Sequence, residues 1–305
     1  MKTFLIKSLS FFLIIILLLT LFLHHYGGYV DYFYNKFTTP KASSMIIGDS
    51  RALQGLQPAI INEYYNNSKF DLPIFNYSFT ISQGLIGSHY RKSILKKIDA
   101  NTKKGLFIIA INPWMLGSKK ENNNYKGEFK ESGTPPHNMN FISMNPNFEY
   151  LLKNYNYFHF KAVFRKKSFL HKDGWLEENN LPKDSLVFKD WKKNQINMFT
   201  GFIKGYKVSE FRKKSLDTLI KDLKKYGQVY LVSTPIDKDI LEIENRFYPD
   251  FDKDMDAVSK LNSVAYFNFN KANNQSYATY DGHHIDKFGG KLFTKALCDS
   301  IMKSL

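Results

Sequence analysis

The sequence Met45-Ile46-Ile47-Gly48-Asp49-Ser50-Arg51 joins a short apolar run to a turn that ends in a serine. The run predicts a buried strand over residues 44–48, with the Ser50 hydroxyl just past its end. Far downstream, Asp281-Gly282-His283-His284 places an acid three residues before a histidine. A serine becomes a nucleophile when a base takes its proton, and an acid holds that base in the right tautomer. The chain supplies these three groups in the order Ser, Asp, His.

Predicted strands and helices alternate over much of the remaining chain. Strands are expected over residues 44–48, 72–79, 106–111, 228–233 and 265–270, and helices over residues 58–65, 84–98, 207–226, 240–262 and 285–305. This alternation predicts an α/β domain with a parallel sheet, here a flavodoxin-like three-layer α/β/α sandwich. The carboxyl ends of parallel strands share one edge, so Ser50, Asp281 and His284 are expected to meet there.

Residues 117–205 interrupt the alternation with a polar, aromatic and turn-rich segment that includes Pro135-Pro136 and Lys172-Asp173-Gly174. The segment is too long for a connecting loop, so it is expected to be an insert with some structure of its own. The predicted organisation is therefore an anchor over residues 1–25, a juxtamembrane linker over 26–43, and an α/β domain over 44–305.

The N-terminus predicts a membrane helix. Residues 9–23 are almost entirely apolar, and the run extends back towards residue 4, close to the ~20 residues that a span requires. Lys2 and Lys7 precede it, which favours a cytoplasmic N-terminus and a domain outside the membrane. His24-His25-Tyr26 follows in place of a small-residue cleavage site, so an uncleaved signal anchor is expected, with a cleaved signal peptide as the alternative. The aromatic residues of the linker suit the membrane interface or the start of the domain's packing.

The net charge of +15 comes mainly from scattered lysines, which favours a solvated surface over a nucleic-acid site. No helix-turn-helix, zinc-finger or RNP signature is visible, and no nucleic-acid partner is expected. The single cysteine, Cys298, has no partner for an intrachain disulfide and is expected to pack as a small core residue.

Gly48-Asp49-Ser50, followed far downstream by Asp281-x-x-His284, resembles the SGNH (GDSL-type) hydrolase superfamily, in a membrane-anchored form. The resemblance runs from about Met45 to the C-terminus and omits the central insert. It implies that Ser50 is the nucleophile, His284 the general base and Asp281 its orienting partner, without a cofactor. The family's spacing of acid and base selects His284 over its neighbour His283.

An oxyanion hole needs two or three hydrogen-bond donors. The resemblance implies the backbone amide of Ser50, a glycine after the second strand and an asparagine after the third. Asn112 matches the asparagine, although the residues around it differ from the family's usual Gly-x-Asn-Asp; a turn residue before Pro113 is the alternative. Gly84 is the best match to the glycine, and Gly87 competes with it.

Other polar and aromatic residues have two interpretations each. Arg51 suits a pairing with Asp49 or with an acidic substrate, and a structural ion pair is preferred. Adjacent histidines on a helix point apart, so no metal site is expected at the His283-His284 pair. The tryptophans could stack on sugar rings or pack in the core; they are Trp114, Trp175 and Trp191.

The sequence therefore predicts acyl transfer through a serine ester outside the cytoplasmic membrane. An esterase acting on O-acyl groups of a cell-surface glycan is the first expectation. An O-acyltransferase that modifies an envelope polysaccharide, with a multi-spanning membrane acyltransferase as its partner, is the alternative, because membrane-bound relatives implied by the resemblance acetylate alginate or modify teichoic acid. A non-catalytic glycan-binding or assembly protein is the third.

Overall fold

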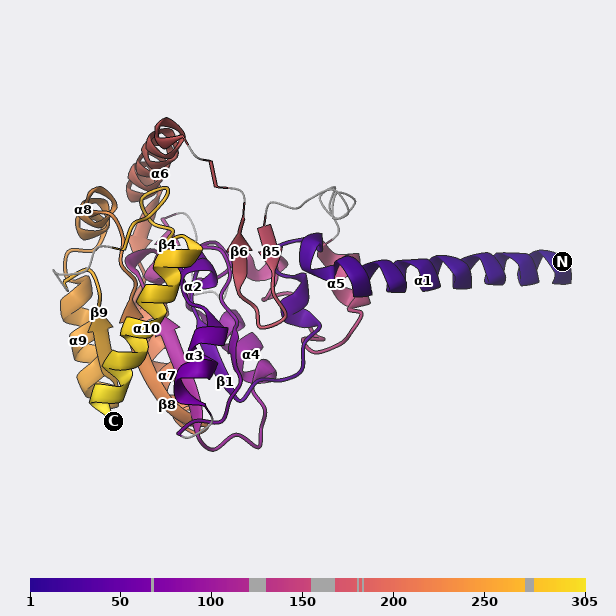
Figure 1. Cartoon of the computed structure of the whole chain (residues 1–305), viewed down its shortest axis with the longest axis horizontal. Coiled ribbons are helices and arrows are strands. Elements are labelled where there is room, and N and C mark those ends of the chain that lie inside the picture. Colours follow the sequence, from indigo (N-terminus) through magenta and orange to yellow (C-terminus); the bar gives the residue numbers. More distant parts are fainter. Residues whose placement is uncertain (67–68, 121–129, 155–167, 180, 183, 272–276) are drawn as a thin grey trace.

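In the computed structural model, the described residues are 1–305 except 67–68, 121–129, 155–167, 180, 183 and 272–276. A five-stranded parallel sheet lies at the centre, in the order β2-β1-β3-β8-β9 (Figure 1). Its strands are β1 (Ser44–Ile47), β2 (Ile74–Asn76), β3 (Gly105–Ala110), β8 (Gly227–Ser233) and β9 (Ala265–Asn268). Counted along the chain this order is 2-1-3-4-5, the flavodoxin-like topology, so the predicted fold class is confirmed.

Helices cover both faces of the sheet and complete three layers. One face packs on α4 (Ser88–Lys97), α7 (Glu210–Leu223) and α9 (Phe251–Asn262). The other packs on α2 (Ser50–Gly55), α3 (Pro58–Tyr65) and α10 (Lys287–Ser304), of which α3 and α10 lie towards the viewer in Figure 1. Along β1, Met45 and Ile47 face the first layer and Ile46 the second, so the strand is apolar throughout because both faces are buried.

Two predicted elements differ most from the observed ones. The helix expected over residues 240–262 is two helices, α8 (Lys238–Phe247) and α9, because Pro249 between them cannot continue a helix. Of the strand expected over residues 72–79, only β2 is a regular strand. The residues that follow β2 still run alongside β1 and its turn. Tyr77 N donates to Ile46 O at 2.8 Å and Phe79 N donates to Gly48 O at 3.1 Å.

The described parts of the insert do have structure of their own. β4 (Gly117–Lys119) pairs with β7 (Tyr206–Val208), and β5 (Ser168–Leu170) pairs with β6 (Leu176–Glu178), both antiparallel. The α-helices in the described part of the insert are α5 (Phe148–Asn154) and α6 (Ser185–Gly205), and the sequence pattern predicted neither of them. The side chain of Asp184 caps α6 by accepting from Leu186 N at 2.8 Å.

α1 (Lys2–Val30) projects away from the sheet (Figure 1). Among the described residues it is the one helix long and apolar enough to cross a membrane. It continues five residues past the predicted boundary at residue 25, and Leu23, Gly27 and Val30 are buried near its C-terminal end. The last turns of the helix therefore pack within the folded domain.

Residues 26–43, expected as a juxtamembrane linker, contribute to the packing of the domain. Tyr34 and Phe37 are buried in the main core, so the aromatic residues begin the packing of the domain. Lys36 is also fully buried, and its Nζ donates to the carbonyls of Asn76 and Gly174. The connection after α1 is thereby attached both to β2 and to the insert.

Candidate active site

Ser50 occupies the first residue of α2, directly after the turn that ends β1. A side chain at Gly48 would place its Cβ 2.8 Å from Ala52 Cβ and 3.0 Å from Ala110 O, so this close turn needs a glycine. Asp49 caps the helix by accepting from Arg51 N at 3.0 Å. Local sequence therefore holds the Ser50 hydroxyl at the carboxyl end of β1, as predicted.

Ser50, His284 and Asp281 form one hydrogen-bonded row. Ser50 Oγ lies 2.8 Å from His284 Nε2, and His284 Nδ1 lies 2.7 Å from Asp281 Oδ2. The Asp281 carboxylate accepts only, so Nδ1 carries the proton and Nε2 of the neutral ring is left to accept from the serine hydroxyl. The structure thus brings together the three residues that the sequence placed at one sheet edge.

A tight turn holds the acid. Asp281 Oδ1 accepts from His283 N at 3.1 Å and from His284 N at 2.9 Å. Gly282 has a φ of +97°, which glycine adopts without strain. Burial alone would raise the pKa of Asp281, but the neighbouring His284 and these N–H groups outweigh it and lower the pKa. Asp281 therefore remains a carboxylate and orients His284.

Tyr280 and Gln54, which sequence reasoning did not identify, support the histidine. The Tyr280 ring stacks on His284 with centroids 5.8 Å apart, and its hydroxyl donates to Gln54 Oε1. The edge of Trp191 meets Tyr280 at 6.1 Å. Adjacency to Asp281 was the only sequence signal for Tyr280, and nothing in the sequence marked Gln54.

Asn112 lies beside the nucleophile turn and also caps the segment after β3. Its Nδ2 donates to Asp49 Oδ2 at 2.7 Å, while its Oδ1 accepts from Trp114 N at 3.1 Å and Met115 N at 3.3 Å. Asn112 therefore has the alternative role that the sequence allowed, that of a turn residue before Pro113. Nδ2 carries two hydrogens and Asp49 accepts one, so a role of Asn112 towards an oxyanion stays a prediction.

Gly84 touches the nucleophile turn, but the structure does not support its amide as an oxyanion donor. The Gly84 N–H donates to Thr80 O at 2.7 Å. A Cβ at this position would lie 2.7 Å from Gly48 O, so glycine is needed here for close packing. The competitor Gly87 caps the start of α4, and its carbonyl accepts from Arg91 N at 3.0 Å.

Arg51 pairs with Glu244 of α8, not with Asp49 as one interpretation of the sequence held. Both side chains of the pair are 3% exposed. Burial opposes the positive charge, but the Glu244 carboxylate outweighs it and raises the pKa of Arg51. The sequence carried no signal for Glu244, because 193 positions separate the partners.

His283 is a packed neighbour of the row. Its ring meets Phe199 edge-on at 5.2 Å and lies 3.8 Å from the His284 ring. Burial lowers its pKa well below the ordinary value, which keeps it neutral. The argument that the two histidines point apart on a helix is wrong, because residues 281–284 form a turn and bring ligand atoms of Asp281, His283 and His284 within 4.8 Å. Both ring nitrogens of His284 already face Asp281 and Ser50, so the arrangement suits proton transfer better than metal binding.

The three tryptophans differ in their surroundings. Trp114 is buried and stacks between Phe199 and Phe247, which assigns it to core packing. Trp175 is half-buried, and its indole N–H donates to Gln54 O at 2.7 Å. Trp191 lies beside Tyr280, so the two half-buried tryptophans remain candidates for stacking on a sugar ring.

In comparisons with known proteins, no family model matches the chain and no curated protein matches it. The chemistry is therefore inferred from the geometry. A hydroxyl, an imidazole and a carboxylate in hydrogen-bonded sequence are arranged for nucleophilic attack with general-base assistance.

Proposed function

We propose that this protein is a serine esterase of the SGNH hydrolase type that cleaves O-acyl esters through an acyl-enzyme. The observation that carries the proposal is the row in which Ser50 Oγ lies 2.8 Å from His284 Nε2 and His284 Nδ1 lies 2.7 Å from Asp281 Oδ2. These distances are within the reach required of a nucleophile, its base and the group that orients the base.

In the first half-reaction, Ser50 Oγ attacks the ester carbonyl carbon while His284 Nε2 accepts the hydroxyl proton. Asp281 stabilises the imidazolium that results. The imidazolium then gives its proton to the leaving alcohol, and the acyl group stays on Ser50. In the second half-reaction water attacks the acyl-enzyme, His284 again accepts and returns the proton, and the carboxylic acid is released.

The negative oxygen of each tetrahedral intermediate needs donors. The Ser50 N–H stands at the first helical position of α2, where backbone N–H groups have no intrahelical acceptor, so it suits this role. The second hydrogen of Asn112 Nδ2 is the other donor we propose, because Asp49 holds that amide beside the same turn.

We place the catalytic domain outside the cytoplasmic membrane, tethered by α1, with O-acyl groups of a cell-surface glycan as substrate. The apolar helix supports the tether, and the lysines that precede it favour a cytoplasmic N-terminus. The same helix favours an O-acyltransferase as the second candidate, in which a glycan hydroxyl replaces water in the second half-reaction. A non-catalytic role is less well supported, since the row of side chains is complete.

The test is covalent labelling of the full-length chain by a fluorophosphonate, with the adduct located by mass spectrometry. We expect labelling at Ser50, and loss of labelling in Ser50→Ala and His284→Ala. Ser78→Ala is a matched control, because Ser78 is a buried serine near the end of β2. An adduct on another residue, or turnover of an aryl acetate that survives Ser50→Ala, would refute the proposal.

A further inference from the structure

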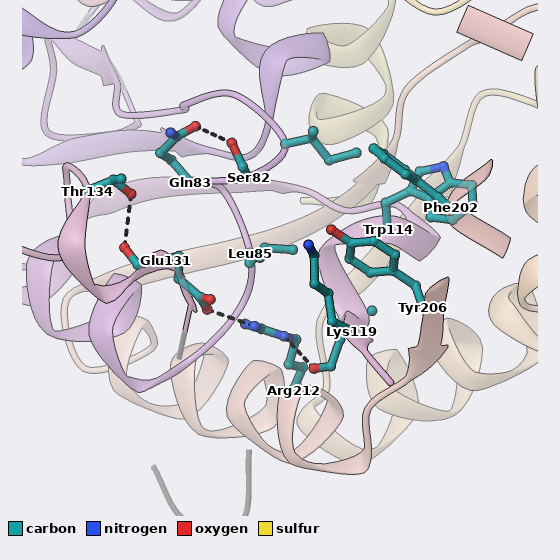
Figure 2. Close-up of a pocket in the computed structure, with 13 residues that line it drawn as sticks. Ser82, Gln83, Leu85, Trp114, Lys119, Glu131, Thr134, Phe202, Tyr206 and Arg212 are labelled. Carbon is teal, nitrogen blue, oxygen red and sulfur yellow. Dashed lines mark hydrogen bonds and ion pairs between the residues drawn. The ribbon is translucent and has the colours of Figure 1, made fainter. Parts of the chain in front are cut away.

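A cavity of about 320 Å³ lies at the carboxyl edge of the sheet (Figure 2), and Ser50, Asp281 and His284 are not among the residues that line it. Its walls come from the segment after β2, which contributes Ile81 and Leu85, and from the segment after β3, which contributes Trp114. Phe202 of α6 and Arg212 of α7 also line it. The insert therefore helps to build a cavity that the five-stranded sheet and its helices alone would not enclose.

The cavity is mainly apolar. Figure 2 shows Trp114 and Phe202 next to each other, with Leu85 across from them. The Trp114 ring is held in place because it stacks on Phe247 with centroids 4.4 Å apart. Ligand sites commonly combine such apolar walls with a few polar groups.

The buried charge of Arg212 in the cavity wall is neutralised within the protein. Arg212 Nη2 lies 2.7 Å from Glu131 Oε1, and Nη1 donates to Ile86 O at 2.8 Å. Both side chains of the ion pair are nearly fully buried. The half-buried Lys119 extends its amine beside the Tyr206 hydroxyl (Figure 2). An uncharged, apolar group therefore fits this cavity without leaving a buried charge unpaired.

The strip of chain that forms one wall of the cavity contacts the nucleophile turn. β1 lies between β2 and β3, so the segments that wall the cavity flank the residues that follow β1. Gly84 packs directly on this turn, since a Cβ there would lie 3.1 Å from Asp49 Cα. Its neighbours Ser82 and Gln83 line the cavity. One short strip of chain thus contacts the nucleophile turn with Gly84 and the cavity with Ser82 and Gln83. In a flavodoxin-like sheet, ligands bind at the β1/β3 switch point, which is where the nucleophile turn lies.

We propose that this cavity receives the acyl group of the substrate, and that the protein therefore acts on esters of apolar acyl groups longer than acetyl. The inference rests on the proposed esterase function. The volume of about 320 Å³ is roughly twice the ~150 Å³ apolar cavity that binds benzene, and an acetyl methyl would leave most of it unfilled. Each additional buried methylene should raise kcat/KM by roughly fourfold until the cavity is filled.

The test uses the full-length chain in lipid nanodiscs and measures kcat/KM for p-nitrophenyl acetate, butyrate and hexanoate. We expect kcat/KM to increase along this series. Leu85→Trp should fill the cavity and lower kcat/KM for the hexanoate at least tenfold more than kcat/KM for the acetate. Leu261→Trp is the matched control, because Leu261 is 73% exposed on α9 and does not line the cavity.

The outcomes separate this inference from the proposed function. A flat chain-length profile, or equal loss for all three esters in Leu85→Trp, would overturn the acyl assignment while Ser50-dependent turnover of the acetate still supported an esterase. Absence of Ser50-dependent turnover for every ester would refute the esterase and with it the acyl assignment. Binding of the unreactive hexanamide, measured by calorimetry, should likewise be lost in Leu85→Trp and retained in Leu261→Trp; equal binding by both would contradict the cavity as the site.

Discussion

Arg51, the residue after the proposed nucleophile, forms an ion pair with Glu244 in which each side chain is only 3% exposed. Arg51 lies in α2 and Glu244 in α8, so the pair attaches the helix that begins with Ser50 to a helix from the other end of the chain. The ion pair therefore stabilises the fold and also helps to hold Ser50 in position.

Glu244→Ala is expected to lower the free energy of unfolding by roughly 3–5 kcal/mol, because it leaves the Arg51 charge buried and unpaired. Replacing both partners, as Arg51→Met with Glu244→Leu, should lose less, since no charge is then stranded. Chemical denaturation of the purified chain measures both. Glu210→Ala serves as the control, because the Glu210 side chain is 63% exposed in its pair with Lys213 and should contribute less than about 1 kcal/mol. Equal losses in Glu244→Ala and Glu210→Ala would contradict the prediction.

Ser50→Ala and His284→Ala should each lower kcat by several orders of magnitude, and the double variant should be hardly slower than either one. The reason is that the two side chains act as a unit in one proton transfer, so removal of either abolishes the step. Turnover of an aryl ester by the three variants is the measurement. Losses that multiply in the double variant would mean that the residues act independently.

His283→Leu should keep kcat within about tenfold of the wild type, whereas His284→Ala should abolish it. His283 faces Phe199 and has its pKa lowered by burial, so its contribution is packing that leucine largely replaces. Turnover and thermal unfolding are both measured, because loss of a packing contact should lower the thermal stability more than the rate of turnover. If His283→Leu is inactive and His284→Ala is active, the base has been assigned to the wrong histidine.

Lys97 predicts a pH-dependent stability. It is fully buried, and its Nζ donates to Thr39 O at 2.7 Å and Ile142 O at 2.9 Å. Burial lowers its pKa from 10.5 to about 7. Between these values the unfolded chain binds the proton that the folded chain lacks, so stability rises with pH, by up to roughly 1.4 kcal/mol per pH unit.

The measurement compares wild type with Lys97→Met by denaturation at several pH values from about 6 to 10. The wild type should gain stability relative to the variant as pH increases above about 7, the pKa of Lys97 in the folded protein, and the gain should end near 10.5. Other groups that titrate in this window are present in both proteins and cancel. A difference that stays constant with pH would show that Lys97 is charged in the folded state throughout.

The features that could be predicted from the sequence are those set by residues close together in the chain: a strand, a turn and a helix. The apolar run before Gly48 predicted β1 because a strand buried on both faces needs apolar residues throughout. The three-residue spacing placed Asp281 beside His284 on a turn, where the two side chains meet. The apolar residues of α1 likewise predicted a helix long enough to cross a membrane.

Only the tertiary structure decided which distant residues meet. Glu244 lies within a helix, and no periodicity indicates that it will face Arg51. Gly84 matched a donor position in sequence, but its N–H donates to Thr80 while its surface packs on the nucleophile turn. In the aromatic stretch that suited a membrane linker, Tyr34 and Phe37 are instead buried in the main core. β2 and the insert supply the acceptors that allow Lys36 to be buried beside them. Periodicity reports which face of an element is buried, whereas partners are set by how the layers pack.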